Sequence, residues 1–163
     1  MNIYERQLQD ADEAIRANPR DAGPYNRRGI IYFRLGQHER AIQDFDKAIS
    51  LNPEDILAYH SRGNAYYGLG EYEKAVQDHN EVIRHSQQNE FRFAHASYSN
   101  RGLAYYGLGK YEKAIQDYNE AIRLNPRDAN SYFGRGRAYK AIGKSIEAER
   151  EFASAKELGY DGP

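Results

Sequence analysis

The sequence predicts an all-α solenoid of antiparallel helix pairs, and three repeated features point to this fold. A five-residue segment that begins with tyrosine and ends with glycine occurs four times, at 25–29, 59–63, 98–102 and 132–136. Each of these glycines is followed 12 residues later by an alanine, and four residues further on by a bulky side chain. An Asn-Pro pair recurs at 18–19, 52–53 and 125–126. Self-similarity at a spacing of about 34 residues indicates stacked helical units.

The first element is a single helix over residues 3–17. It has the pattern of a second helix without its first, and Gln7 and Ala11 stand where the later units carry alanine and a bulky residue. A large ring at the second of these sites would fill space against a unit's own first helix. Its loss therefore predicts an N-terminal cap on the array.

Each following unit is expected to contain two helices. Within 56–70 the apolar side chains recur at helical spacing, and they do so again within 71–85. Gly70 lies between these two runs, where a helix end favours a residue that tolerates the left-handed conformation. Asn-Pro ends the second run of several units, because the residue before proline is pushed out of helical geometry. One such pair cannot bury its apolar face alone, so the pairs must stack.

Two elements depart from this pattern. The last helix, over 144–158, carries Ser145 and Lys156 where its counterparts have apolar residues, and this polar face is expected of a terminal unit. The second junction lacks Asn-Pro and holds five extra residues at about 90–94. We expect 87–94 to form an extra helical turn or the most mobile loop, with Phe91 or Phe93 packed inward.

The pattern resembles the tetratricopeptide repeat, whose 34 residues carry an aromatic, Leu-Gly, Tyr, Ala, a second aromatic, Ala and Pro in this order. The resemblance implies a right-handed α-solenoid in one domain over 1–163, with a concave surface lined by the first helices. It also implies protein partners and assembly or chaperone-like roles. The units divide into a half-repeat at 3–21 and four repeats, at 22–55, 56–89, 95–128 and 129–162.

Composition excludes several other classes of protein. The 163 residues include no cysteine, so disulfide frameworks and thiolate metal sites are excluded. No stretch approaches the roughly 18 apolar residues of a membrane span, and the first residues do not resemble a signal peptide, so we expect a cytoplasmic location. A net charge of −1 gives no general attraction for nucleic acid or anionic membranes.

Motifs for catalysis are missing from the sequence. The five histidines form no His-x-x-x-His pair, and there is no phosphate-binding or dinucleotide-binding loop. His79 occupies a repeat position that is usually an aromatic core residue, so we expect a packed core histidine. A metal site built from His85 and His95 is a minor alternative. The sequence therefore predicts no enzyme, no cofactor and no metal.

Charge is segregated between the two helices of each unit. The chain has 24 acidic residues, but none lies in the segments expected to form the first helix of each repeat. These four first-helix windows are 22–36, 56–70, 95–109 and 129–143. Part of their basic content has a structural explanation, because four arginines that precede the repeat glycines recur in register with a series of acids. These arginines are Arg28, Arg62, Arg101 and Arg135, and the acids are Asp10, Asp44, Asp78, Asp117 and Glu151. The pattern gives no such partner to Arg27, Arg34, Arg137 and Lys140, which are candidate ligand contacts.

These features predict a noncatalytic module that binds a peptide segment, with an acidic ligand favoured by the basic wall. Phe33, Tyr67 and Tyr106 would supply apolar platforms, and Asn64 and Asn100 would hold the peptide backbone. The complete candidate groove consists of Arg27, Ile30, Phe33, Arg34, His60, Asn64, Tyr67, Asn100, Leu103, Tyr106, Phe133, Arg137 and Lys140.

Three alternatives remain open at this point. One subclass of the family grips acidic chaperone tails through a carboxylate clamp, and His60, Asn64 and Asn100 match part of it. Asn130 and Gly134, however, stand where that clamp needs cations. Binding of RNA is less favoured, because no helix carries a dense basic run. A self-associating scaffold is the third alternative, so the chain is expected to be a monomer or a weak homodimer.

Overall fold

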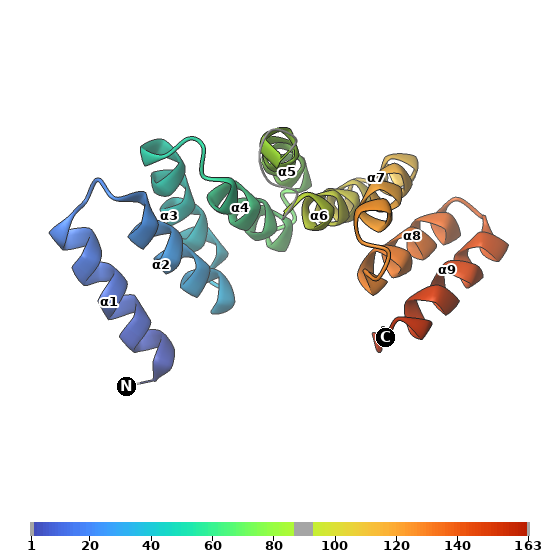
Figure 1. Cartoon of the computed structure of the whole chain (residues 1–163), viewed down its shortest axis with the longest axis horizontal. Coiled ribbons are helices and arrows are strands. Elements are labelled where there is room, and N and C mark those ends of the chain that lie inside the picture. Colours follow the sequence, from blue (N-terminus) through green and yellow to red (C-terminus); the bar gives the residue numbers. More distant parts are fainter. Residues whose placement is uncertain (1, 87–92, 163) are drawn as a thin grey trace. The chain divides into compact units, whose positions relative to one another are not determined.

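A computed structural model of the chain describes residues 2–86 and 93–162, and within these ranges it contains nine α-helices and no strand (Figure 1). The helices are α1 (Ile3–Ala17), α2 (Ala22–Arg34), α3 (His38–Leu51), α4 (Ile56–Gly68), α5 (Tyr72–Ser86), α6 (Ala94–Gly107), α7 (Tyr111–Leu124), α8 (Ala129–Ala141) and α9 (Ser145–Glu157). Their contacts divide the chain into two units, Met1–Glu81 and Val82–Pro163, with the boundary inside α5. The all-α fold that the sequence predicts is thus confirmed.

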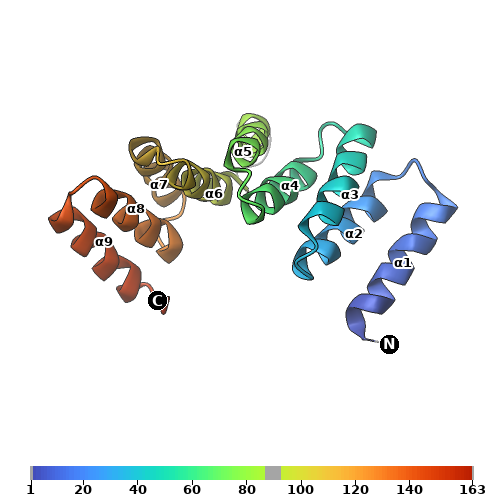
Figure 2. The same ribbon diagram turned by 180° about the vertical axis from the view of Figure 1, so that it is seen from behind.

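In the first unit, α2 pairs with α3, α1 packs against α2, and α4 packs against both α3 and α2. Figure 2 shows these helices from behind. The centre of the unit is made by Ala41, Phe45 and Ala65, all of which are fully buried. A Cβ atom at Gly29 would lie only 2.7 Å from the Phe45 ring. The glycine is therefore needed for the close approach of the two helices of this repeat.

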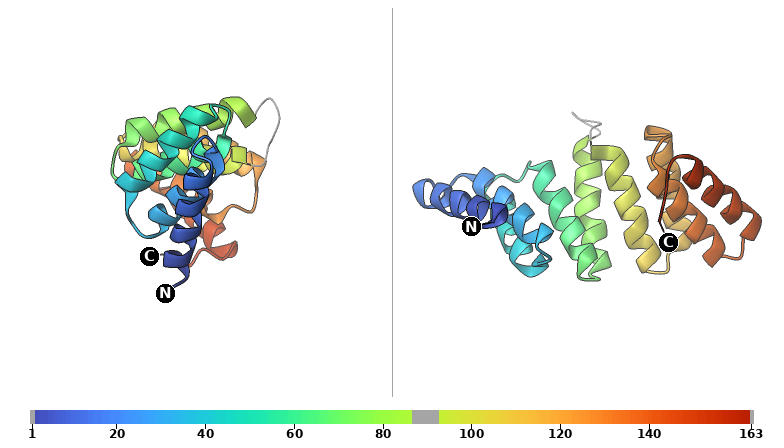
Figure 3. Two further views of the ribbon diagram at one scale, coloured as in Figure 1. Left: turned by 90° about the vertical axis from the view of Figure 1, so that its left-hand side faces the viewer. Right: turned by 90° about the horizontal axis from the view of Figure 1, so that it is seen from below.

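The second unit repeats this arrangement with α6 on α7, α8 on α7 and α6, and α9 on α8. Its helices, coloured yellow to red, lie side by side in the right-hand view of Figure 3. Tyr118 fills the centre together with Ala114 and Ala138. Added Cβ atoms at Gly102 and Gly134 would lie 3.0 Å and 2.5 Å from its ring. Two glycines on neighbouring first helices thus leave the space that one tyrosine fills.

The helix ends follow local sequence signals. Asp21 and Asp55 cap α2 and α4 by accepting hydrogen bonds from backbone N–H groups of the first turn. The second helices α3 and α7 end at Asn52 and Asn125, directly before proline. Between α2 and α3 the chain turns at Gly36, whose φ of 72° lies in the left-handed region that favours glycine.

Three elements depart from the repeat pattern, and the structure describes α1 and α9 fully but the second junction only in part. α1 is a single helix with a capping box between Asn2 and Glu5, and Ser145 and Lys156 are both exposed on α9. At the second junction Phe93 is half-buried and directly precedes α6. The rest of that junction, including Phe91, lies outside the described residues.

Candidate functional site

The four arginines that precede the repeat glycines bind carboxylates within their own repeats, as the sequence predicts. Both Nε and Nη2 of Arg28 donate hydrogen bonds to the two oxygens of Asp44, at 2.8 Å and 2.7 Å. Arg62 binds Asp78 and Arg101 binds Asp117 in the same bidentate way. In the last repeat, Nε and Nη2 of Arg135 both donate to the same oxygen of Glu151, Oε2, at 2.9 Å and 2.6 Å.

Each arginine also lies near tyrosine rings of its own helix. The guanidinium carbon of Arg62 is 5.5 Å from the Tyr59 ring centroid and 5.8 Å from that of Tyr66, and Arg28 and Arg101 have equivalent tyrosines on both sides. A further bond reaches the preceding second helix, where Nη1 of Arg28 donates to Asp12 and Nη1 of Arg62 donates to Asp46, both at 2.6 Å. The sequence analysis did not find this bond across the repeat junction.

The acid series needs one correction. Asp10 was placed in register with Asp44, but in the structure Asp12 is the residue of α1 that binds Arg28. Asp10 is exposed, and among the described residues no cation lies within ion-pair distance of its carboxylate. The reason is that the arginine of each pair lies on the first helix of the same repeat, and α1 has no first helix before it in the part of the chain that the structure describes.

Burial changes the titration of Asp78 and Asp117. It raises the pKa of Asp78 and Asp117 above the ordinary range of a carboxyl group, while the bound arginines oppose that rise. The hydrogen bonds that Arg28 donates to Asp44 raise the pKa of the Arg28 guanidinium. The charges of these four arginines are therefore used in ion pairs within the fold. Positive charge available to a ligand must come from the other basic residues.

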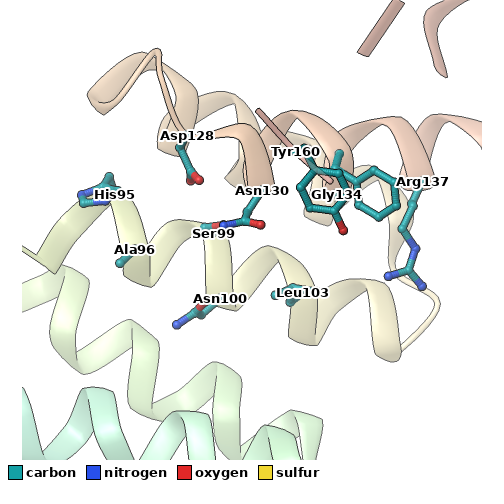
Figure 4. Close-up of a pocket in the computed structure, with 11 residues that line it drawn as sticks. His95, Ala96, Ser99, Asn100, Leu103, Asp128, Asn130, Gly134, Arg137 and Tyr160 are labelled. Atoms are coloured by element: carbon teal, nitrogen blue, oxygen red, sulfur yellow. The ribbon is translucent and has the colours of Figure 1, made fainter. Parts of the chain in front are cut away.

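Four of the predicted groove residues, Asn100, Leu103, Phe133 and Arg137, line one pocket in the second unit. This pocket between α6 and α8 has a volume of about 400 Å³. Figure 4 shows that its residues come from these two helices and from the C-terminal segment that carries Tyr160. Its other walls are made by His95, Ala96, Ser99, Asp128, Asn130 and Gly134.

A second pocket in the same unit brings together the aromatic and basic candidates. Tyr106 of α6 and Phe133, Arg137 and Lys140 of α8 line a volume of about 550 Å³, together with Ala141 and Phe152. The guanidinium carbon of Arg137 lies 4.4 Å from the Tyr106 ring centroid, which is within cation–π distance. Because both pockets share Phe133 and Arg137, they form one continuous surface, which we call the α6–α8 groove.

In the first unit the candidates fall into two groups. Arg27, Ile30 and Arg34 of α2 line a pocket of about 380 Å³ with Gln7, Asp10 and Ala11 of α1. Phe33 lies beside these residues in sequence, but its ring pairs with His38 of the same repeat at 5.3 Å. The α2 candidates thus share their pocket with the N-terminal helix, which the sequence analysis did not predict.

The candidates on α4 contact the second helix of their own repeat. The His60 ring lies 5.5 Å from that of His79, which is fully buried as predicted, and Tyr67 pairs with Tyr72 at 5.4 Å. Asn64 is half-buried on the same helix. A role for these three residues in binding stays a prediction.

Two pocket residues were missed by sequence reasoning. Tyr160 stacks on Phe133 with a centroid distance of 4.2 Å and an interplanar angle of 22°. Tyr160 follows Gly159, whose φ of 88° allows the chain to reverse after α9. The repeat pattern has no position that packs an aromatic ring on the first helix in this way. Asp128 directly precedes the acid-free window of α8, so sequence reasoning did not include it in the groove.

Within residues 2–86 and 93–162, no group of three or more His, Asp or Glu side chains could hold a metal ion. No helix in these ranges is long and apolar enough to cross a bilayer.

Comparison with known families gives matches along most of the chain. A family model described as "TPR repeat" matches residues 29–70 and 102–143, which together make up half of the chain. Two models described as "Tetratricopeptide repeat" match residues 11–43 and 56–89. A comparison with curated protein sequences found no match.

Several solved structures are similar to this chain. The structure titled "MamA 41-end from Desulfovibrio magneticus RS-1" is 25% identical, with a TM-score of 0.86 over 98% of this chain and 88% of that one. "MamA RS-1 ArsTM double mutant" is also 25% identical, with a TM-score of 0.85 over 95% and 84%. PilF of Pseudomonas aeruginosa, at 16% identity, has a TM-score of 0.85 over 98% and 70%, a likeness that concerns the fold alone.

Proposed function

Since the chain belongs to the tetratricopeptide repeat family, we propose that it is a noncatalytic protein-interaction module whose α6–α8 groove binds an acidic peptide segment. The family match supports a scaffold that holds protein partners. The preference for an acidic segment rests on the groove itself, because the backbone of the solenoid alone carries no specificity.

One observation carries this proposal. Arg137 and Lys140 are both exposed, and they share a pocket with the Tyr106 and Phe133 rings, while α6 and α8 contain no Asp or Glu. A peptide carboxylate could meet these two cations while an adjacent apolar side chain lies on the rings. Asn100 and Asn130 add amide groups at the other end of the groove, where they could bond the peptide backbone.

The first unit offers related chemistry. α2 and α4 also lack acidic residues, and Arg27 and Arg34 are exposed on α2. An acidic segment could therefore also bind along the first helices of that unit, with Phe33, His60, Asn64 and Tyr67 as its neighbours. The α6–α8 groove is the better supported site, because there the cations and the aromatic rings line the same pocket.

We expect a complex of micromolar affinity that weakens with salt. Exposed ion pairs contribute only about 0–1 kcal/mol each, so affinity must come from several of them together with the ring contacts. Screening reduces each of these exposed contacts as ionic strength rises. The same titration with single-stranded RNA tests the nucleic-acid alternative, since RNA binding would fall far more steeply with salt.

A charge-reversal pair tests the proposal. The probe is a fluorescein-labelled peptide of Asp and Glu residues with two leucines, and binding is measured by fluorescence anisotropy. Arg137→Glu with Lys140→Glu should abolish saturable binding, because both groove cations become anions. The matched control, Arg127→Glu with Arg150→Glu, makes the same change in net charge at exposed positions outside both pockets and should bind as the wild type does. Equal loss in both variants would reduce the effect to net charge and overturn the proposal.

A further inference from the structure

In the first repeat, the second helix α3 packs against the first helix α2. Helix α1 has the pattern of such a second helix. α1 aligns with α3 at a spacing of 34 residues, so Gln7, Asp10 and Ala11 correspond to Ala41, Asp44 and Phe45. In the first repeat these α3 residues face α2, where Asp44 binds Arg28 and the Phe45 ring lies against Gly29. Within the described residues, no helix lies on the corresponding face of α1.

The structure leaves this face open as a pocket. Gln7, Asp10 and Ala11 line one wall of the 380 Å³ volume, and Arg27, Ile30, Ile31 and Arg34 of α2 line the other. Ile31 compensates in part for the small Ala11, since the corresponding position on later first helices is alanine, as at Ala65. Ala11 and Ile31 are therefore only 4% and 7% exposed. The space beyond them remains unfilled.

In the last repeat, a residue outside the helices covers an aromatic ring of the first helix. After α9 the chain reverses at Gly159, and the Tyr160 ring stacks on Phe133 of α8. A side chain of the protein itself thus covers an aromatic ring of the terminal first helix. Among the described residues, no side chain covers Asp10 in this way. Its carboxylate is exposed and has no cation partner there.

We propose that the pocket between α1 and α2 binds a partner's amphipathic α-helix, in the position that a first helix occupies on the second helix of the first repeat. The register of the repeats specifies what this helix must carry. It presents a basic residue to Asp10, as α2 presents Arg28 to Asp44, and a bulky apolar residue toward Ala11, where the chain supplies no ring. Acidic residues on its opposite flank face Arg27 and Arg34. This site lies on α1 and α2, apart from the α6–α8 groove, and it does not depend on the function proposed for that groove.

The occupant must be a helix that is amphipathic in charge as well as in hydrophobicity. The pocket has one carboxylate on its α1 rim and two guanidinium groups on its α2 rim, with Ala11, Ile30 and Ile31 between them. A helix with cations on one flank and anions on the other matches both rims. A helix that is acidic on both flanks brings a negative charge to Asp10, and one that is basic on both flanks brings positive charge to the two arginines.

The test uses the full chain and three synthetic, helix-stabilised peptides with the same leucine stripe. One peptide has an arginine flank and a glutamate flank, one has two glutamate flanks, and one has two arginine flanks. Binding of labelled peptide is measured by fluorescence anisotropy. We expect the mixed peptide to bind the wild type most tightly. Asp10→Asn should weaken it about fivefold, which corresponds to loss of one charge-assisted contact of about 1 kcal/mol.

Three variants make the test specific. Glu13→Gln removes the same charge from an exposed residue of α1 that does not line the pocket, and it should leave binding unchanged. Ala11→Phe places a ring in the pocket and should block the mixed peptide. Asp10→Lys should shift the preference toward the peptide with two glutamate flanks. The proposal is overturned if the mixed peptide shows no saturable binding, or if Asp10→Asn and Ala11→Phe leave its affinity unchanged.

Discussion

At the residue scale, the distinctive feature is an arginine where the common repeat pattern has leucine. Burying a guanidinium is costly unless it is paired and hydrogen-bonded. Here each such arginine has a carboxylate of its own repeat, and Arg28, Arg62 and Arg135 also donate to the preceding second helix, at Asp12, Asp46 and Asn119. The tyrosines beside them leave space for the planar group, which explains part of the unusual number of 15 tyrosines.

The two partners of one pair should differ in what their loss costs. Asp117→Leu leaves a cation in a largely buried site and should lower the free energy of unfolding by about 3 kcal/mol. Arg101→Leu should cost less, because leucine suits this repeat position and the acid can become neutral. Chemical denaturation of both variants at neutral pH measures the difference. A larger loss for Arg101→Leu would contradict this account of the pair.

The same two variants should respond differently to pH. In Arg101→Leu, burial still raises the pKa of Asp117, and the bound cation that opposed the rise is gone. The folded state then binds a proton more readily than the unfolded state, so stability falls as pH rises. The deficit relative to wild type should therefore shrink between about pH 8 and pH 5. For Asp117→Leu the deficit should not shrink as the pH falls, because the wild type gains stability by protonating Asp117, whose pKa is raised, and the variant cannot. Denaturation curves across this range test both statements.

A second residue-scale prediction concerns the glycines around Tyr118. An added Cβ atom at Gly134 would lie 2.5 Å from the ring, with no flexible end to give way. Gly134→Ala should therefore lower the free energy of unfolding by about 1–3 kcal/mol through overpacking. Ala141→Gly, at an exposed position near the end of the same helix, is the control and should cost clearly less. Thermal unfolding followed by circular dichroism measures both, and a tolerated alanine at 134 would show that Tyr118 can move.

At the scale of elements, α1 supports the first repeat through its contacts with α2. It binds Arg28 through Asp12 and helps to bury Ile31 of α2. Deleting residues 1–18 should remove both contacts and expose apolar surface of α2. We expect a lower Tm and concentration-dependent light scattering. An unchanged Tm would mean that α1 contributes no stability to the first repeat.

At the scale of the whole molecule, stability should vary along the array. In a stack of repeats each helix contacts only its neighbours, so the terminal helices have the fewest contacts to lose. Among the described residues α1 packs only on α2, and α9 packs only on α8. Amide hydrogen exchange should therefore be fastest in α1 and α9 and slowest around Phe45 and Tyr118. Mass spectrometry of exchanged peptides can test this order, and equal protection of α1 and α3 would contradict it.

The sequence predicted the helices well because their signals are local and repeated. Glycines, the Asn-Pro pairs and the apolar spacing set the helix bounds, and the register of Arg28 with Asp44 followed from counting alone. Tyr160 could not be found in this way, since its place on Phe133 depends on a chain reversal at Gly159, where most other units have Asn-Pro. Asp12 was missed because its bond crosses from one repeat to the next, and the acid at its position recurs only at Asp46, with asparagine in the next two repeats.

The arginine bonds also have a consequence for the history of such a gene. Arg28 and Arg62 each bind an acid of their own repeat and an acid of the repeat before, so the segment 22–55 carries one donor, Arg28, and both kinds of acceptor, Asp44 and Asp46. If the segment 22–55 were duplicated in tandem, the new copy would find a matching acid behind it and would offer one to the unit ahead. Unequal recombination between repeats could therefore lengthen or shorten the array by whole units without leaving a buried charge unpaired.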